Sequence, residues 1–515
     1  MLSEFKNEPD TDFTQEANRR KQCDAIESVL KQLGREYDLV IGGKRLKSPR
    51  KFTSINPSDK SQVLGTFHSA TEEQAVQAIE AATATFQSWK QVPAQERADL
   101  LFRTANLLRA RRFEANAWMI LEVGKPWSEA DGETSEAIDF CEYYVREALR
   151  YAAPGRLIRI PSERNELRYI PLGPGAVIPP WNFPCATMVG LTTAAIVAGN
   201  TVVLKPSSDS PAIAAFFMRL LEEAGLPAGV VNLVTGGGAT VGNTLVEHPK
   251  TRFIAFTGSK EVGLHINLEA AKTRPGQIWI KRTILEMGGK DFIIVDETAG
   301  LNAAVDGVMK SAFGFQGQKC SACSRAIVHE QIYREFVDRL AARTKEIKVG
   351  PTIDPANFMG PVINEKAMQT MLNYIEIGKK EGRLVAGGGR AEGNGFFIQP
   401  TILADIDPKA RLAQEEIFGP VLAVIKAKDF DEAIRIANDS EYGLTGSLYS
   451  TRRDRIERAK NECHAGNFYV NRKCTGALVG IHPFGGFNMS GTDSKSGGPD
   501  YLALFTQAKS ISEVI

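Results

Sequence analysis

Apolar positions along the chain follow two spacings, one typical of amphipathic helices and the other of short buried strands. Residues 71–90 open on Thr71 with Gln74 three positions later, which is the pattern of a helix capping box. Four apolar residues then share one predicted helical face: Val76, Ile79, Ala82 and Phe86. Residues 96–125 predict a second, longer helical stretch with an internal break.

The region from 175 to 263 has the most regular pattern. Four short apolar runs end in Pro, Gly or Ser, at residues 175–180, 200–207, 230–238 and 252–259. Between two of them Ser210 is placed to cap a helix, Pro211 suits its first turn, and Gly225 suits its end. Alternating strands and helices favour an α/β fold with largely parallel sheets, which bind ligands at the carboxyl ends of their strands. A nucleotide-binding fold is therefore expected here.

Two further segments stand apart from this region. Residues 155–173 are polar, rich in β-forming residues and hairpin-like, and the tail 490–515 is rich in Gly and Ser before it becomes amphipathic. A projecting hairpin and a late strand often serve a subunit interface, so a homo-oligomer is expected, as a dimer or an assembly of dimers. The alternative is a surface element that only caps the fold.

Length and composition limit the class of protein. A chain of 515 residues is too long for one ordinary core, so two or three domains are expected. With 43% hydrophobic and 24% charged residues the composition is that of a soluble globular protein, and no apolar run of about 20 residues predicts a membrane span. A net charge of +1 gives no global field for nucleic acid or an anionic membrane. Seven sparse cysteines and a polar N-terminus predict a reducing, cytoplasmic setting.

Three turns after predicted strands are candidates for contact with a nucleotide. Gly236, Gly238 and Gly242 lie in one of them without forming the usual GxGxxG fingerprint, and ordinary turn geometry explains such glycines more often. Ser259 suits a phosphate held at a helix N-terminus, or a plain helix cap. Lys205 at a strand end suits ribose hydroxyls or a phosphate, although a lone lysine is usually solvated.

Two polar residues interrupt apolar segments. Asn182 lies between Trp181 and Phe183 in a proline-bounded turn, where its side-chain amide suits a developing oxyanion or simply satisfies the turn backbone. Glu286 ends an apolar run just before two glycines. Apolar surroundings would raise its pKa and suit it to general base catalysis. On these residues alone, a surface carboxylate at a strand end is the preferred interpretation of Glu286.

Cys320 and Cys323 form a Cys-x-x-Cys pair within GFQGQKCSACSR. A zinc site is disfavoured because the other cysteines are isolated and His329 has no partner histidine at zinc spacing. A thioredoxin-like dithiol is disfavoured because such a pair begins a helix early in a small domain. A single nucleophile is the third possibility, since glycines, a neighbouring lysine and a following helix would expose the thiol and lower its pKa from about 8.5.

Seven motifs in order resemble those of the aldehyde dehydrogenase superfamily: PWNFP, GNTVVLKPS, FTGSKEVG, LEMGGKD, GQKCSACSR, QEEIFGPV and PFGGFNMSG. The match covers nearly the whole chain. The resemblance implies a Rossmann-type NAD(P)-binding domain over residues 1–155 and 174–286 and an α/β catalytic domain over 287–484. A β-hairpin oligomerisation element over 156–173 and the C-terminal tail 485–515 complete the implied fold.

The resemblance also implies roles for individual residues. Cys320 would be the nucleophile, Asn182 and the Cys320 backbone amide would form the oxyanion hole, and Glu286 would be the base that activates water. No metal is implied. The cofactor, NAD or NADP, would be contacted by Lys205, Ser208, Gly238, Gly242, Ser259, Glu416 and Phe418. Ser208 stands where many NAD-preferring relatives carry a glutamate that repels a 2′-phosphate, so NADP use stays open.

Ser321, the loop NRKCTGALVGIHPFGGF and the tail SGTDSKSGGPDYL resemble one branch of the superfamily. That branch, here in its monofunctional form, oxidises L-glutamate γ-semialdehyde, formed from Δ1-pyrroline-5-carboxylate, to L-glutamate in proline degradation. Ser321 and the backbone amides of Gly476 and Ala477 would bind the α-carboxylate, with Phe183 and Phe484 flanking the aliphatic part.

Two alternatives stay open beside this expectation. Another acidic semialdehyde, such as succinate semialdehyde, is the alternative substrate. A catalytically silent protein on the same fold is the alternative outside the enzymes, although all three candidate catalytic residues are present. Cys323 replaces a residue that is usually small in the family, and it is expected to be a packed bystander whose nearness would expose Cys320 to oxidation.

Overall fold

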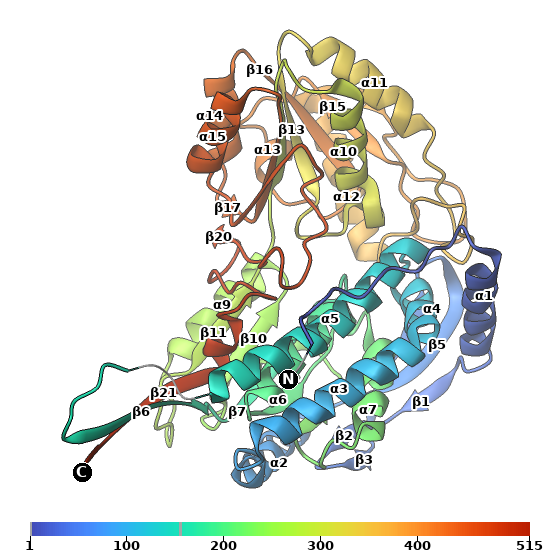
Figure 1. Ribbon diagram of the computed structural model, residues 1–515. Helices are drawn as coiled ribbons and strands as arrows, with labels where there is room; N and C mark the ends of the chain where they lie inside the picture. Colours follow the sequence, from blue (N-terminus) through green and yellow to red (C-terminus); the bar gives the residue numbers. More distant parts are fainter. Residues whose placement is uncertain (1–2, 154–156) are drawn as a thin grey trace.

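The computed structural model describes residues 3–153 and 157–515 (Figure 1). Two α/β lobes follow one another along the chain, the earlier one coloured blue to green and the later one yellow to red, and a two-stranded ribbon projects from the earlier lobe. The predicted α/β class is confirmed. The expected domain boundary at 155–156 lies outside the described residues.

Seven strands form the sheet of the earlier lobe: β2 (Leu39–Ile41), β3 (Lys44–Leu46), β7 (Pro174–Ile178), β8 (Thr201–Leu204), β9 (Val231–Leu233), β10 (Phe253–Thr257) and β11 (Arg282–Glu286). Their spatial order is β11-β10-β7-β8-β9-β2-β3. The strands from β7 to β11 pair in parallel, whereas β2 pairs antiparallel with both β9 and β3. The four apolar runs predicted between 175 and 259 are β7, β8, β9 and β10.

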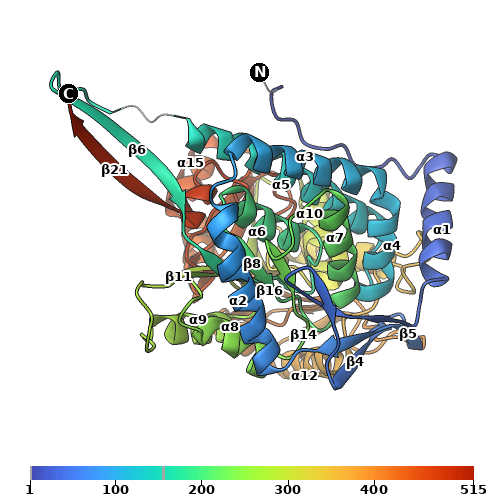
Figure 2. The ribbon, with the colours of Figure 1, turned by 90° about the horizontal axis from the view of Figure 1, so that it is seen from below.

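The helices of this lobe are α1 (Glu16–Leu30), α2 (Glu72–Trp89), α3 (Ala94–Ala110), α4 (Arg112–Val123), α5 (Trp127–Ala152), α6 (Ala186–Val197), α7 (Pro211–Glu223), α8 (Asn243–Glu247) and α9 (Lys260–Ala271). A π-helical turn, η1 (Gly238–Gly242), precedes α8. Beside α1 and α4 lies a small sheet of β1 (Arg35–Tyr37), β5 (Asp59–Ser69) and β4 (Arg50–Asn56), in that order (Figure 2).

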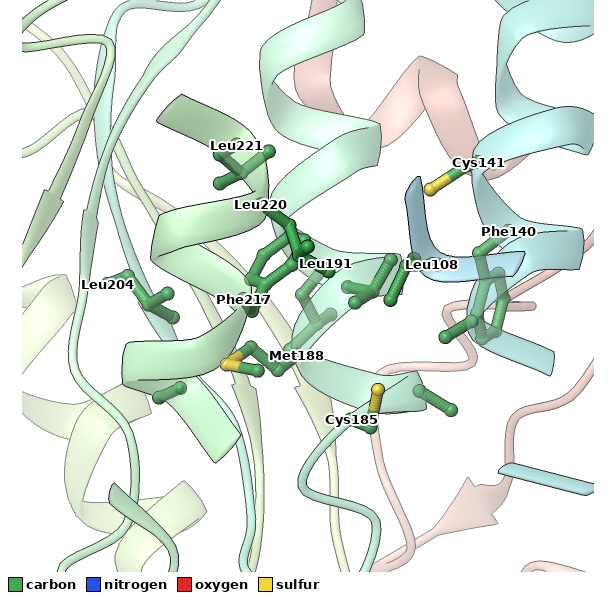
Figure 3. Packing of buried hydrophobic residues seen from close by; sticks show 14 of the residues in the cluster. Leu108, Phe140, Cys141, Cys185, Met188, Leu191, Leu204, Phe217, Leu220 and Leu221 are labelled. Atoms are coloured by element: carbon green, nitrogen blue, oxygen red, sulfur yellow. The ribbon is translucent and has the colours of Figure 1, made fainter. Parts of the chain in front are cut away.

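Helix α6 is apolar on every side and lies buried between its neighbours, as expected for a helix without a solvent face. Figure 3 shows Met188 and Leu191 of α6 among Phe140 of α5 and Phe217 of α7. The apolar core of the lobe therefore holds α6, and with it the turn that carries Asn182 just before the helix.

The capping box predicted at the start of α2 is present, with Thr71 and Gln74 bonded in both directions. The predicted buried face is only half right, because Val76 and Phe86 are half-buried. The buried stripe is formed by Ala75, Ala78, Ile79, Ala82 and Trp89. The small alanine side chains let α2 approach the sheet closely. The alanines therefore face the sheet, while the bulkier Val76 and Phe86 lie at the side of the buried face.

Two other helix predictions hold, except that Ser210 occupies the cap position of α7 without a side-chain hydrogen bond. The stretch 96–125 is broken between α3 and α4 at Arg111, whose φ is −111° and ψ 25°. Helix α7 follows Ser210 with a proline in its first turn, and Gly225 ends it with a φ of +92° that favours glycine.

The later lobe is built on a second seven-stranded sheet: β12 (Asp291–Val295), β13 (Cys323–His329), β14 (Arg383–Ala386), β15 (Thr401–Ala404), β16 (Val421–Ala427), β18 (Thr445–Tyr449) and β19 (Asn467–Val470). Its order is β14-β15-β16-β13-β12-β18-β19, and only β14 pairs antiparallel within the described residues. Its helices are α10 (Leu301–Phe313), α11 (Tyr333–Lys345), α12 (Glu365–Glu381), α13 (Arg411–Gln414), α14 (Phe430–Asn438) and α15 (Arg453–Glu462). Two short 3-10 helices are η2 (Gly314–Gly317) and η3 (Tyr501–Phe505), and β17 (Tyr442–Gly443) pairs with β20 (Phe487–Asn488).

The projecting ribbon joins segments from distant parts of the chain. Strand β6 (Glu163–Pro171) pairs antiparallel along its whole length with β21 (Thr506–Val514), and both extend away from the lobes (Figures 1 and 2). The hairpin-like pattern at 155–173 therefore contributes one strand, and the C-terminal tail supplies its partner. Within the described ranges, no helix has the length and apolarity needed to cross a bilayer.

Candidate active site

Two cavities meet where the lobes face each other. The first has a volume of about 740 Å³ and is lined largely by the carboxyl ends of strands in the earlier lobe. The second, of about 660 Å³, lies between α5, the loop after β19 and the segment 484–501. Cys320, Glu286 and Phe183 line both cavities. A group bound in the first cavity and a group bound in the second would thus meet at Cys320.

The thiol of Cys320 donates a hydrogen bond to Glu286, with 3.4 Å between Sγ and Oε1. Glu286 ends β11, and Cys320 lies in the loop that leads into β13. Burial raises the pKa of Glu286 to about 7, and the hydrogen bond from Cys320 offsets part of that effect. The pair therefore consists of a thiol and a carboxyl group that is poised to change protonation near neutrality.

The predicted lowering of the Cys320 pKa is wrong for this arrangement. Burial, followed by the negative charges of Glu286 and Asp291, raises the pKa of the thiol well above its ordinary value. The neighbouring Lys319 pairs with Glu129 at 2.7 Å instead of the thiol, and the segment after Cys320 becomes a strand rather than a helix. The thiolate must consequently be produced by transfer of its proton to a base, and Glu286 is within hydrogen-bond reach.

Asn182 reaches the same loop from the turn before α6. Its Nδ2 donates to the backbone oxygen of Gln318 at 3.0 Å, so its amide satisfies the loop that carries Cys320 and not its own turn. Glu133 supports that turn by accepting the backbone N–H groups of Cys185 and Ala186 at 2.7 and 3.0 Å. Asn182 is therefore tied to this loop at Gln318, two residues before Cys320.

A buried lysine connects the Asn182 turn to the loop before Cys320. The Lys125 ammonium is fully buried, pairs with Glu133 at 2.5 Å, and lies 3.9 and 4.3 Å from the ring centres of Phe183 and Phe315. A cation between two aromatic faces is attracted by both rings. Lys125 and Glu133 were not predicted from the sequence, since neither stands in an informative local pattern.

The loop before Cys320 has a strained backbone. Phe315 and Gln316 have φ angles of +48° and +56°, a region that residues other than glycine rarely adopt. The Gln316 side-chain amide offsets this strain by donating to the backbone oxygens of Gly124 and Pro361 at 3.0 and 2.8 Å. Such conformations persist where surrounding contacts determine them, often at functional sites.

The first cavity contains most of the residues expected around a cofactor. Its lining includes Lys205, Gly238, Gly242, Ser259, Glu416 and Phe418. Ser208 is not in that lining: its hydroxyl lies 3.4 Å from the Gly236 oxygen, and Ser207 lines the cavity instead. Ser259 caps α9 through the Val262 N–H, so the plain cap interpretation is confirmed as well.

The residues of the first cavity fit a dinucleotide. Burial lowers the pKa of Lys205 to about 8, and no carboxylate pairs with it among the described residues. Among the residues that the structure describes, its ammonium bonds only the Pro206 oxygen, at 3.2 Å, which leaves donors for hydroxyl or phosphate oxygens. Glu416 accepts the Gly289 N–H at 2.9 Å, and a Cβ at position 288 would lie 2.1 Å from its Oε2. Gly288 is therefore needed for the carboxylate to face the cavity.

A family model described as the aldehyde dehydrogenase family matches residues 45–511. The chain belongs to this family. It is 54% identical over 514 residues to 1-pyrroline-5-carboxylate dehydrogenase of Geobacillus thermodenitrificans, with the whole of both chains covered. The crystal structure of 1-pyrroline-5-carboxylate dehydrogenase from Thermus with bound NAD matches with a TM-score of 0.98 and 49% identity, again over the whole of both chains.

A longer protein contains a similar unit. Proline utilization A from Bdellovibrio bacteriovorus matches with a TM-score of 0.98 and 47% identity over 99% of this chain, which covers 53% of that protein. The expected family membership and fold are confirmed by these matches.

Like its first cavity, the second cavity of this aldehyde dehydrogenase brings together predicted residues from distant segments. Ser321, Gly476, Ala477, Phe183 and Phe484 all line it. Lys319 and Lys473 line it too, and neither was predicted. Burial lowers the pKa of Lys473, and repulsion from Lys319 lowers it further. Lys319 is paired with Glu129, and carboxyl groups such as those of Glu136 and Asp139 line the cavity as well. The groups left to bind a carboxylate are therefore Ser321, Lys473 and the turn at Gly476.

Proposed function

We propose that the chain catalyses the NAD-dependent oxidation of L-glutamate γ-semialdehyde, formed from Δ1-pyrroline-5-carboxylate, to L-glutamate in proline degradation. The observation that carries this proposal is the position of Cys320 and Glu286 at the junction of two cavities, one of which suits a dinucleotide and the other an acidic substrate. Similarity to 1-pyrroline-5-carboxylate dehydrogenase over the whole chain supports the choice of substrate.

Cys320 acts as the nucleophile in this proposal. Glu286 accepts the thiol proton, and the thiolate sulfur adds to the aldehyde carbon while Asn182 and the Cys320 backbone N–H donate to the oxyanion. Bound NAD supplies the hydride acceptor for the oxidation. Glu286 releases the thiol proton to solvent and then removes a proton from the water that attacks the thioester on Cys320. The C–S bond breaks, the acid leaves, and Glu286 returns its proton to the Cys320 sulfur.

The second cavity recognises the α-carboxylate end of the substrate. Ser321 and the amides at Gly476 and Ala477 bind the carboxylate oxygens, while the rings of Phe183 and Phe484 enclose the aliphatic chain. Lys205, Ser259 and Glu416 contact the cofactor in the first cavity, together with Gly238, Gly242 and Phe418. We assign Ser208 to the surroundings of the ribose, where its short side chain leaves NADP as a second cofactor.

The proposed domain boundaries are those expected from the family. Residues 287–484 form the catalytic domain, since β11 ends at Glu286 and the second sheet begins with β12. The preceding segments form the NAD-binding domain. The ribbon of β6 and β21 serves a homo-oligomer.

A substrate comparison tests the proposal. NADH formation should give a higher kcat/KM for pyrroline-5-carboxylate than for succinate semialdehyde, because the shorter chain cannot reach both Cys320 and the carboxylate-binding turn. A higher kcat/KM for succinate semialdehyde would show that the assigned substrate is wrong. Running the same comparison with NADP in place of NAD measures the cofactor preference.

Replacement of the nucleophile tests the mechanism. Cys320→Ser should lower kcat by a factor of about 10³ or more, because an alcohol is a far weaker nucleophile at neutral pH. Cys323→Ala serves as the matched control, since Cys323 is buried and lines neither of these two cavities. Full activity of Cys320→Ser would refute the assignment.

A further inference from the structure

The beginning of the chain forms part of the second cavity. Residues 3–12, the N-terminal segment, form neither helix nor strand and lead toward α1 (dark blue in Figures 1 and 2). Four of these residues line the second cavity: Asn7, Glu8, Pro9 and Asp10. The N-terminal segment therefore supplies one wall of the cavity that contains Cys320 and the turn at Gly476.

Two buried carboxylates of α5 hold the N-terminal segment in place. Asp139 accepts the Glu8 N–H at 2.7 Å, and Asp131 accepts the Thr11 N–H at 2.6 Å. The two aspartates lie eight positions apart on α5, which corresponds to a rise of about 12 Å. Three residues of fully extended chain span about 10 Å. Between Glu8 and Thr11 the segment is therefore extended, and it runs antiparallel to α5.

The side chain of Asn7 bridges α5 and the loop after β19. Its Nδ2 donates to Asp139 Oδ2 at 2.8 Å and to the backbone oxygen of Val479 at 3.0 Å. A side-chain amide carries two N–H donors, so a single group satisfies both acceptors. Val479 is buried and follows the Gly476–Ala477 turn directly after Leu478. Asn7 thus fixes the position of this end of the turn relative to α5.

Phe5 of the N-terminal segment packs on the next residue of the same loop. Its ring meets Tyr143 of α5 edge to face, with ring centres 5.2 Å apart. Gly480 has a φ of +76°, and a Cβ at that position would lie 3.1 Å from both the Phe5 and the Tyr143 rings. The loop backbone therefore rests directly on these two rings.

The two ends of the turn are held from different parts of the chain. Arg472 holds the first end, because its Nη2 donates to the backbone oxygens of Thr475 and Gly476 at 3.0 and 2.9 Å. The N–H groups of Gly476 and Ala477 make no hydrogen bond to another described residue, so both are free to bind a ligand. Their direction consequently depends on Arg472 at one end and on the N-terminal segment at the other.

We propose that the N-terminal segment is a working part of the substrate site, and that Asn7 is a positioning residue that acts through Val479. Its bond holds the amides of the turn at the distance from Cys320 that a semialdehyde with an α-carboxylate requires. This inference rests on the proposed function, in which those amides bind the carboxylate.

The physical reason is that the substrate has two ends joined by a short aliphatic chain. Its aldehyde carbon must reach Cys320 while its carboxylate reaches the turn. A turn that is free to move satisfies both requirements in only a fraction of the enzyme molecules, and the apparent affinity falls by that fraction. The cofactor binds in the first cavity, which the N-terminal segment does not line, so its affinity does not depend on Asn7.

Steady-state kinetics of Asn7→Ala test the proposal. The KM for pyrroline-5-carboxylate should rise by about tenfold, while the KM for NAD and the kcat at saturation stay within about twofold of the wild type. Asn18→Ala is the matched control. The Asn18 amide donates to the Asp12 oxygen at 3.0 Å, at the other end of the segment, and Asn18 lines neither of these two cavities. This control should keep the wild-type KM.

A neutral aldehyde separates positioning from general damage to the fold. Propionaldehyde has no carboxylate for the turn to bind, so its kcat/KM should be the same in Asn7→Ala as in the wild type. An equal loss with propionaldehyde, or a raised KM for NAD, would overturn the positioning role. An unchanged KM for pyrroline-5-carboxylate in Asn7→Ala would overturn it too.

Hydrogen exchange tests the contact without any substrate. The N–H groups of Gly480 and His482 donate to the oxygens of Gly497 and Leu478 at 2.9 and 2.8 Å. In the whole enzyme, peptides covering 478–484 should exchange about tenfold faster in Asn7→Ala and at the wild-type rate in Asn18→Ala. Unchanged exchange in Asn7→Ala would overturn the proposal. If the wild type oxidises propionaldehyde but not pyrroline-5-carboxylate, the proposed function fails, and the exchange result still decides whether Asn7 holds the turn.

Discussion

Glu286 and Cys320 share a hydrogen bond, and in the proposed mechanism their protonation states determine the pH at which the reaction runs. Burial raises the pKa of Glu286 to about 7. In the proposed mechanism Glu286 must be deprotonated to accept a proton from the thiol or from water. A drop in pH through this value therefore removes the base.

We predict that kcat falls as the pH decreases through about 7 and levels off above it. The measurement is the pH profile of steady-state NADH formation at saturating substrate. The Glu286→Gln variant should lose most of the activity, and its remaining kcat should no longer change with pH near 7. A wild-type profile that stays flat down to the ordinary pKa of a glutamate, about 4.3, would remove Glu286 as the base.

A second prediction concerns Lys125, the buried cation between Phe183 and Phe315. Lys125→Met removes one member of a fully buried ion pair and leaves Glu133 without its partner, which costs about 3 to 5 kcal/mol of stability. Thermal unfolding should show a large drop in midpoint temperature. The double variant Lys125→Met with Glu133→Gln leaves no unpaired charge and should recover part of the loss. A double variant less stable than the single one would contradict this account.

At the scale of single elements, helix caps give a matched comparison. Thr71 accepts the Gln74 N–H at the start of α2, whereas Ser210 stands at the same position before α7 without a side-chain cap bond. Thr71→Ala should lower stability by about 1 kcal/mol, and Ser210→Ala should have a much smaller effect. Chemical denaturation of both variants measures the difference. Equal losses would show that the cap bond contributes nothing.

The elements themselves were largely predictable because their signals are local. Proline, glycine and capping residues lie within one turn of the boundaries they set, as at α7, where Pro211 begins the helix and Gly225 follows its end. The buried face of α2 was less predictable. Its orientation depends on how closely Ala75, Ala78 and Ala82 let it approach the sheet, and that distance is a property of the packed lobe.

At the scale of the whole molecule, the ribbon of β6 and β21 extends beyond both lobes and exposes Tyr169, Val514 and Ile515. Deletion of residues 506–515 removes β21 and leaves β6 without its pairing partner. We expect a smaller oligomer than that of the full chain, measured by light scattering after size-exclusion chromatography. If the deletion variant forms an oligomer with the same number of subunits as the full chain, the ribbon is not needed for assembly.

The sequence by itself determined the α/β class, the positions of four strands of the first sheet, and the family motifs that contain Cys320, Glu286 and Asn182. These features depend on residue types and on short spacings along the chain, both of which can be recognised without knowledge of the fold. The tertiary structure alone decided which distant groups meet. It paired the tail with β6, placed Lys125 between two rings, and buried Cys323 in the apolar cluster that also contains Cys474. It also reversed the predicted pKa shift of the Cys320 thiol, because burial and two nearby carboxylates outweigh what glycines and a lysine suggest along the chain.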